Sequence, residues 1–236
     1  MFVIFRNSDE IRRYDIDNEC KVEILSPQGA LTSNYNAKII LDKDNVYISD
    51  CFNKRIIKIN KLNFAKKCID TSDMGGAWLG GIYEDKFLIR FFDFFPIKNK
   101  GLYLMAFSKK DKHYEKIECQ FNEPYNFSDI FWLGDEYFSN DIASNRLFTI
   151  DVKNKKMDEY LKNLNRNCTY FTRAKGYDYI LTTTGDSRWL EKYTRSGDLV
   201  FKHGFMSHTL ILKVAAHNEC LWLLDRSSNA LMQYQI

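Results

Sequence analysis

The chain has 236 residues, of which 45% are hydrophobic and 28% are charged, and its formal net charge at pH 7 is +3. This composition is typical of a globular protein with a sizeable core, and it excludes disordered, collagen-like and membrane-spanning classes. The 34 basic and 31 acidic residues are interleaved. Because a nucleic-acid-binding surface needs a basic stripe, we expect no nucleic acid among the partners.

The first residues do not resemble a signal peptide, because the apolar run Phe2–Phe5 is short and the charges follow it. The most apolar segment, Phe87–Phe95, is interrupted by Arg90 and Asp93 and is shorter than a membrane span. We therefore expect a cytoplasmic protein without membrane association. Its six cysteines include no Cys-x-x-Cys pair, so we expect free buried thiols and neither disulfides nor zinc ligands.

Strand-type patterns recur along the whole chain. Aromatic residues make up 15% of it and there are three prolines, a composition that favours strands. Six units each consist of an apolar strand, a polar turn and a second strand, which predicts six β-hairpins. The units begin at Phe2, Val46, Phe87, Tyr137, Tyr179 and Leu221.

The spacing of these units indicates the fold class. The steps between successive starts are 44, 41, 50, 42 and 42 residues, and this period is typical of a four-stranded propeller blade. Further strands are expected before the hairpins, as in Ala37–Leu41, and after them, as in Lys21–Leu25. Helical periodicity is weak even at Asp158–Leu164, and a sandwich gives no reason for six similar hairpins. We predict an all-β β-propeller of six blades, each of about 40–50 residues, in a single domain over residues 1–236.

The strand count leaves ring closure open. The sequence predicts roughly 22 strands, about two fewer than six four-stranded blades require. No strand can precede Phe2 and none fits after Ile236. Either two blades are short, or ring closure combines both ends of the chain in one blade. A ring of five blades would leave one strong hairpin unused, so six blades remain the better prediction.

Three hairpin turns share a pattern in which an aspartate precedes the first apolar residue of the next strand by six positions. Short Asp and Asn side chains bond turn amides and tolerate left-handed backbone. Because a metal ion needs one cluster and not a repeat, we predict structural turn roles for these aspartates. The turns are Asp50 with Asn53 and Arg55, Asp141 with Asn145 and Arg146, and Asp225 with Asn229 and Ala230.

These strings resemble the NHL-type repeat of six-bladed, TolB-like β-propellers. The resemblance is carried by Val46–Ile59, Tyr137–Leu147 and Leu221–Leu231, whereas the unit that begins at Phe87 departs most from the pattern. It implies a fold and no particular activity, because such propellers include both binding modules and enzymes.

The resemblance also implies where a ligand would bind. The loops that lead into the inner strand of each blade open on one face around a central channel, and here they differ from blade to blade. We predict a non-catalytic binding or scaffold propeller, without a cofactor, that recognises a protein, peptide or saccharide at the channel mouth. The candidate ligand-binding residues are Asn34, Tyr35, Asn36, Asp73, Tyr125, Asn126 and His208.

The alternative function is that of a metal-dependent hydrolase or lactonase. Gluconolactonase-like six-bladed enzymes use Glu, Asn and Asp around a Ca²⁺ ion in the channel, although their motif does not match this chain residue by residue. The candidate ligands would be Asn34, Asn36, Asp73, Asn126 and His208. The residues alone predict no metal site, because none of the four histidines pairs with another His or Cys at a metal-ligand spacing.

A phenylalanine-rich segment suggests a third hypothesis. One strand face cannot bury four phenylalanines around Asp93, and Pro96 indicates a bulge or an edge. Large exposed apolar patches mark interaction sites. We therefore consider a structural subunit that docks through this segment, with a candidate patch of Phe91, Phe92, Phe94 and Phe95.

Overall fold

The computed structural model describes most of the chain, and the described residues hold 22 strands. None of them belongs to a helix that is long and apolar enough to cross a membrane. The described residues are 2–5, 10–15, 21–24, 37–72, 75–84, 86–94, 97–107, 114–118, 127–141, 144–162, 164, 167–206, 211–217, 219–225, 227–228 and 230–236.

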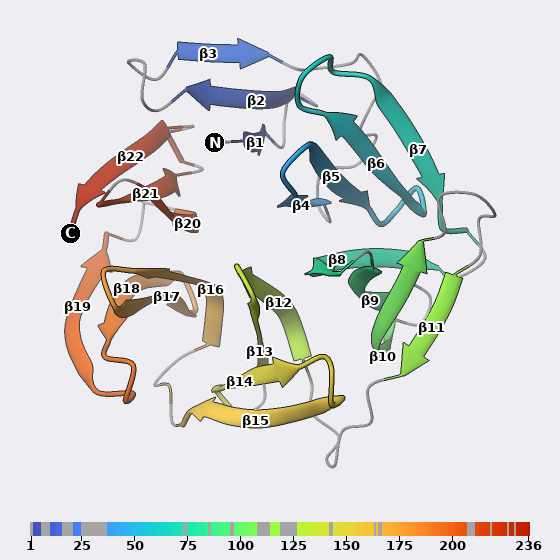
Figure 1. The fold of residues 1–236 in the computed structure, drawn as a ribbon. Helices are drawn as coiled ribbons and strands as arrows, with labels where there is room; N and C mark the ends of the chain where they lie inside the picture. Colours follow the sequence, from blue (N-terminus) through green and yellow to red (C-terminus); the bar gives the residue numbers. More distant parts are fainter. Residues whose placement is uncertain are drawn as a thin grey trace. The chain divides into compact units, whose positions relative to one another are not determined.

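The chain divides into two compact units, Met1–Cys119 and Gln120–Ile236, each with three antiparallel sheets among its described residues (Figure 1). The sheets of the first unit are β1 (Phe2–Phe5), β2 (Glu10–Asp15) and β3 (Lys21–Ile24); β4 (Ala37–Leu41), β5 (Asn45–Asp50), β6 (Arg55–Asn60) and β7 (Lys66–Asp70); and β8 (Gly76–Tyr83), β9 (Lys86–Phe94), β10 (Ile97–Phe107) and β11 (Tyr114–Glu118).

The second unit repeats this plan. Its sheets are β12 (Phe127–Leu133), β13 (Glu136–Asp141), β14 (Arg146–Asp151) and β15 (Lys156–Leu161); β16 (Asn167–Ala174), β17 (Tyr177–Thr184), β18 (Ser187–Tyr193) and β19 (Leu199–Phe205); and β20 (Ile211–His217), β21 (Cys220–Asp225) and β22 (Ala230–Gln235).

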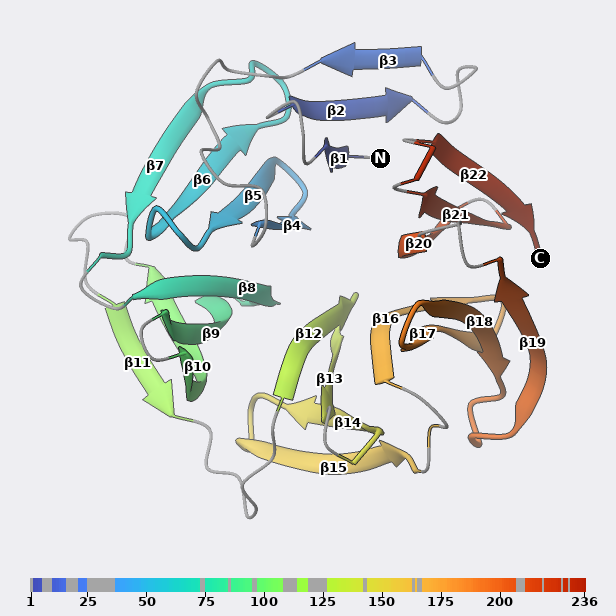
Figure 2. The ribbon, with the colours of Figure 1, turned by 180° about the vertical axis from the view of Figure 1, so that it is seen from behind.

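Within every sheet, strands that are consecutive in sequence pair with one another. Within a unit, the first strand of one sheet contacts the first strand of the next, as β4 contacts β8 and β16 contacts both β12 and β20 (Figure 2). Sheets that meet by their first strands while their last strands point outward are arranged as propeller blades.

The number of complete, four-stranded blades among the described residues is four and not six. The sheets formed by the two ends of the chain have three strands each, in agreement with the two-strand deficit that the sequence indicates. The prediction of a single domain over residues 1–236 stays a prediction.

The core lies between neighbouring sheets. In the second unit, Phe138 of β13 is fully buried, and its ring centroid is 4.7 Å from that of Phe171 on β16, in an edge-to-face contact. The next interface is built in the same way, with Leu181 of β17 in one cluster with Val214 and Leu221 of the following sheet. The three sheets of the second unit thus bury apolar side chains against one another.

Hydrogen bonds reinforce these interfaces inside each unit. In the first unit the Cys51 thiol donates to the carbonyl oxygen of Ala77, at 2.9 Å. In the second, Asn140 Nδ2 donates to the carbonyl oxygen of Cys168, at 2.6 Å. Both donors lie at or just after the end of a second strand, and both acceptors lie on the first strand of the next sheet.

The turn between β4 and β5 is organised by one carboxylate. Asp42 accepts hydrogen bonds from the backbone N–H groups of Asp44 and Asn45, at 2.8 and 2.6 Å, and from the Tyr47 hydroxyl at 2.8 Å. Partial burial raises the pKa of Asp42, but the bonds from Tyr47, Asn45 and Asp44 outweigh it and hold the pKa below its ordinary value of 3.8.

The lowered pKa of Asp42 makes its contribution pH-dependent. Because the carboxylate is stabilised in the folded state, its contribution is present above the ordinary pKa and is lost as the pH falls through the folded-state value. We predict that Asp42→Asn lowers the free energy of unfolding at neutral pH, and that its difference from wild type shrinks below about pH 4. Urea unfolding over a pH series measures this, and a difference independent of pH would contradict it.

The cysteines differ in exposure. Cys51, Cys68, Cys168 and Cys220 are free thiols, and Cys20 and Cys119 lie outside the described residues. The expectation of buried thiols is confirmed for Cys51 and Cys168. It is wrong for Cys68, which is exposed on the outermost strand of its sheet, and Cys220 is only partly buried. Burial raises the pKa of Cys51 to about 12, and it raises the pKa of Cys168 as well.

These differences predict selective labelling. A thiol with a raised pKa holds almost no thiolate at neutral pH, so iodoacetamide should modify Cys68 in the native protein and reach Cys51 and Cys168 only after unfolding. Peptide mass spectrometry before and after denaturation checks this. If iodoacetamide modified Cys51 in the native protein as fast as Cys68, Cys51 would have to be accessible to solvent, which would contradict its buried position.

Candidate functional site

The predicted channel-mouth residues stay predictions. Asn34, Tyr35, Asn36, Asp73, Tyr125, Asn126 and His208 all lie outside the described residues. The phenylalanine segment is described in part. The backbone of Phe91, Phe92 and Phe94 belongs to β9, and Phe95 lies outside the described residues.

Of the two alternatives for the phenylalanine segment, a bulge or an edge, the described strands exclude the edge. β9 pairs with β8 on one side and with β10 on the other, so it is an interior strand of its sheet. A register shift lies between Asn99 and Leu102 of β10, just beyond Pro96 in the chain. The docking role of the phenylalanine patch stays a prediction.

The first of the three turn aspartates is fully engaged by its own hairpin. Asp50 is buried, and it accepts hydrogen bonds from Asn53 Nδ2, at 2.9 and 2.7 Å, and from Arg55 Nε at 2.9 Å. Asp50 also faces Arg55 in the β5–β6 register. The ion pair therefore fixes the hairpin across its turn.

The other two aspartates are also buried and bound by their own turns. Asp141 accepts a hydrogen bond from the Ser144 hydroxyl and lies 4.0 Å from Arg146 Nη2. Asp225 accepts from Ser227, through its backbone N–H at 2.9 Å and its hydroxyl at 2.7 Å, and from the Ser228 hydroxyl at 2.6 Å. These are the contacts of turn-organising carboxylates.

The hairpin of β17 and β18 has no aspartate at this position. Thr183 pairs with Arg188 in the β17–β18 register, as Asp50 pairs with Arg55 in β5–β6. A threonine thus takes the aspartate's position there, and Arg188 Nη1 donates instead to the carbonyl oxygen of Gly185, at 3.0 Å. An aspartate at this position therefore stabilises some hairpins of the protein and is absent from the β17–β18 hairpin.

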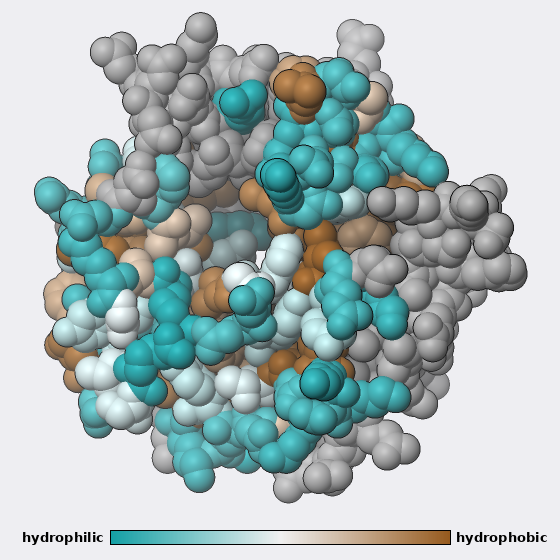
Figure 3. All heavy atoms as spheres, in the orientation of Figure 1, coloured by the Kyte–Doolittle hydropathy of each residue, from teal (hydrophilic) through white to brown (hydrophobic). Residues whose placement is uncertain are grey.

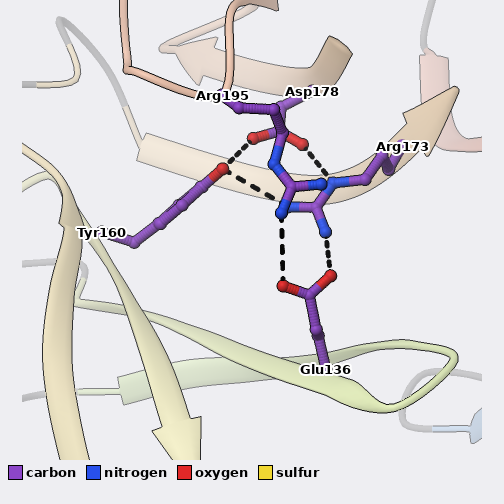
Figure 4. Close-up of polar contacts among 5 residues, drawn as sticks. All are labelled: Glu136, Tyr160, Arg173, Asp178 and Arg195. Carbon is purple, nitrogen blue, oxygen red and sulfur yellow. Dashed lines mark hydrogen bonds and ion pairs between the residues drawn. The ribbon is translucent and has the colours of Figure 1, made fainter. Parts of the chain in front are cut away.

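A second polar constellation, absent from the sequence-based predictions, lies in the second unit (Figure 4). Its members come from two neighbouring sheets and from turns at their ends. We call it the Arg173 cluster, and its members are Glu136, Tyr160, Arg173, Asp178 and Arg195.

Arg173 and Asp178 form the centre of the cluster. They face each other across the β16–β17 turn, and Arg173 Nε donates to Asp178 Oδ1 at 2.6 Å. The side chain of Asp178 is fully buried and that of Arg173 is 15% exposed. The guanidinium also lies 5.3 and 5.8 Å from the ring centroids of Phe138 and Phe171, so the ion pair stands directly on the aromatic core.

The remaining members connect this pair to the preceding sheet. The Tyr160 hydroxyl donates to Asp178 Oδ2 at 2.5 Å. Glu136 accepts from Arg173 and pairs with Arg195 at 3.4 Å. Two guanidinium groups and two carboxylates balance each other, so the cluster holds strands β13, β15, β16 and β17 together without net charge.

The surroundings of Tyr160 favour the protonated form of its hydroxyl. Burial, and next the hydrogen bond to Asp178 and its negative charge, raise the pKa of Tyr160 above its ordinary value. The phenol therefore stays protonated at neutral pH and acts as a donor. Among the described residues, no group of three or more His, Cys, Asp or Glu side chains is placed to hold a metal ion.

Comparisons with known proteins define the class of fold. No family model and no curated protein matches the sequence. Among solved structures, that of a nidogen/laminin complex aligns with a TM-score of 0.63 at 10% identity, over 100% of this chain and 93% of the other.

Two enzymes are similar as well. A streptogramin B lyase aligns with a TM-score of 0.60 at 11% identity, over 100% of this chain and 78% of the other. The PQQ-bound aldose sugar dehydrogenase of Streptomyces coelicolor aligns with a TM-score of 0.59 at 10% identity, over 87% and 79%. At these identities the likeness shows the fold alone, and that fold is an all-β propeller.

The Arg173 cluster predicts unequal effects of charge removal. Arg173→Met should lower the free energy of unfolding by about 3–5 kcal/mol, because it leaves the buried Asp178 carboxylate uncompensated. Arg195→Gln is the matched control, since Arg195 and Glu136 are both 48% exposed. It should cost about 1 kcal/mol or less. Equal effects of the two variants in urea unfolding would contradict a central role for Arg173.

Proposed function

We propose that the protein is a non-catalytic binding or scaffold propeller, which recognises a protein, peptide or saccharide through the loops that lead into its inner strands. One observation supports this most directly. The recurring carboxylates Asp50, Asp141 and Asp225 are each bound by side chains or amides of their own turn. They are therefore parts of the scaffold, and recognition is left to the loops that differ between blades.

The fold is compatible with this function and with its alternative. Similar solved structures include a nidogen/laminin complex, a lyase and a dehydrogenase. Because one fold hosts binding modules and enzymes, the decision rests on the channel-mouth residues. In this proposal Tyr125 and Asn126 contribute an aromatic surface and an amide, and Asn34, Tyr35 and Asn36 contribute the same groups from another loop.

Metal content separates binding from the lactonase alternative. We expect no stoichiometric metal by inductively coupled plasma mass spectrometry of protein purified without chelator, and equal melting temperatures in Ca²⁺ and in EDTA. A site that used Ca²⁺ would bind it only in the folded state, so chelation would lower the melting temperature. One bound Ca²⁺ per chain, with a decrease of several degrees in EDTA, would overturn the proposal in favour of a metal-dependent hydrolase.

Ligand binding by the proposed channel-mouth loops can be tested with a glycan array and a displayed random-peptide library as probes. A ligand selected on the wild-type protein should bind at least about tenfold more weakly to the Tyr125→Ala, Asn126→Ala double variant. Leu62→Ala is the control, because Leu62 is 91% exposed in a turn of the first unit. Equal binding to all three proteins would place the ligand elsewhere.

A further inference from the structure

The sheet of β20, β21 and β22 ends one strand earlier than the four-stranded sheets (Figure 1). In those sheets the third strand, such as β6 or β14, pairs with the second strand on one side and with a fourth strand on the other. β22 holds the third position in its own sheet, and within the described part of the chain it pairs only with β21. Its other side therefore presents the backbone N–H and C=O groups of a strand edge.

The burial of β22 reflects this difference. Its counterparts β6 and β14 each contain buried residues, whereas β22 contains none. Leu231, Met232 and Tyr234 are apolar but only partly buried, and Gln233 and Gln235 are exposed. One more strand beside β22 would remove part of this apolar surface from water.

β22 also differs in charge from the last strands of the other sheets. Each of those strands carries lysine, aspartate or glutamate: β3 is KVEI, β7 is KKCID, β11 is YEKIE, β15 is KMDEYL and β19 is LVFKHGF. Charges on an edge strand keep other strands from pairing with it. β22 has the sequence ALMQYQ and carries no charge, so it lacks this protection.

The backbone of β22 is regular along its whole length. Its register with β21 runs without a shift from Cys220 opposite Gln235 to Asp225 opposite Ala230. Figure 3 shows hydrophilic atoms, in teal, and hydrophobic atoms, in brown, side by side at the left of the molecule, where Figure 1 places β22 and the neighbouring β19. A regular strand with mixed polar and apolar side chains can accept another strand by edge-to-edge pairing.

The side chains of β22 are held in place before any partner binds. Met232 and Tyr234 pack against the apolar cluster between this sheet and the preceding one, and the Tyr234 ring lies 6.4 Å from that of His203 on β19. On the other face, Gln233 Nε2 donates to the Cys220 sulfur at 2.9 Å. Pairing along this edge therefore costs little side-chain entropy.

The sequence of β22 is complementary to itself. Two copies of an edge strand related by a two-fold axis pair antiparallel, and residues opposite each other lie on the same face of the joined sheet. Because side chains alternate between faces, the axis must pass through a residue and not between two residues. An axis at Gln233 pairs the whole stretch 230–236, with Met232 opposite Tyr234 and Gln233 opposite its own copy.

This arrangement favours a second copy over other partners. Methionine beside an aromatic ring is a favourable contact, and the two-fold axis forms the Met232–Tyr234 pair twice. No charge meets a like charge, because residues 230–236 are uncharged. An uncharged edge gives no electrostatic preference for an acidic or a basic partner, whereas an identical strand matches both its hydrogen-bonding groups and its polarity.

We propose that β22 is a dimerisation strand. Two copies of the chain pair antiparallel along this edge, about a two-fold axis at Gln233, and their three-stranded sheets join into one sheet of six strands. The copy takes the position that a fourth strand holds in the four-stranded sheets. β22 does not include any of the channel-mouth residues, so this proposal and the proposed function can fail independently.

The test is sedimentation velocity of the full chain over a range of concentrations. The wild-type protein should form dimers, and Gln233→Lys and Gln233→Glu should each raise the dimer Kd by at least about tenfold, because each places like charges opposite each other at the axis. An equimolar mixture of the two variants should form dimers again, since lysine then faces glutamate. Matching circular dichroism spectra establish that the variants are folded.

Val200→Lys is the control, because Val200 is 51% exposed on β19, the outer strand of the neighbouring sheet. It should leave the dimer unchanged. A wild-type protein that stays monomeric would overturn the proposal and leave the edge to a different partner. Undiminished dimers of either Gln233 variant, a mixture that stays monomeric, or loss of the dimer in Val200→Lys would overturn it as well.

Discussion

In the second unit, neighbouring sheets bury apolar side chains against one another, in clusters that join one sheet to the next. In β5 every residue from Asn45 to Asp50 is buried, as expected for a strand covered on both sides. The edge-to-face contact of Phe138 with Phe171 is an example of this packing between two sheets of the second unit. A sheet of this kind alone would expose apolar side chains to water, so packing against the next sheet of its unit stabilises it.

Polar groups then fix how successive sheets meet. Near the ends of the second strands, Cys51 and Asn140 donate to carbonyl oxygens on the first strand of the next sheet. Where β16 and β17 are joined, Arg173 covers the aromatic core and pairs with buried Asp178. An unpaired charge at that depth would be costly, and the tyrosine and glutamate of the preceding sheet satisfy the remaining donors and acceptors.

The polar contacts within the hairpin turns have a consequence for function. The carboxylates of Asp50, Asp141 and Asp225 accept hydrogen bonds within their own turns, so they contribute to the stability of the hairpins. A propeller with such a scaffold can vary its loops and its outer strands without loss of the fold. The outer strands differ in this way: β19 has exposed apolar residues, whereas β7 and β15 have exposed charged residues.

The sequence by itself determined the all-β class and the position of the hairpins. Apolar runs with a period of two, ended by turn residues, are local signals, so the predicted starts at Val46 and Tyr137 lie within β5 and β13. The sequence also indicated the short sheets at the chain ends. The candidate channel-mouth residues came from a resemblance to a repeat, and they lie outside the described residues.

The tertiary structure alone decided which residues meet across sheets. Arg173 and Asp178 flank a predictable turn and could have been paired from sequence, but Glu136, Tyr160 and Arg195 are distant in the chain and carry no local pattern. The exposure of Cys68 and the interior position of β9 depend on which strand neighbours which. Local periodicity specifies that a strand forms, whereas its neighbours are set by packing between segments far apart in sequence, and only the folded chain contains that information.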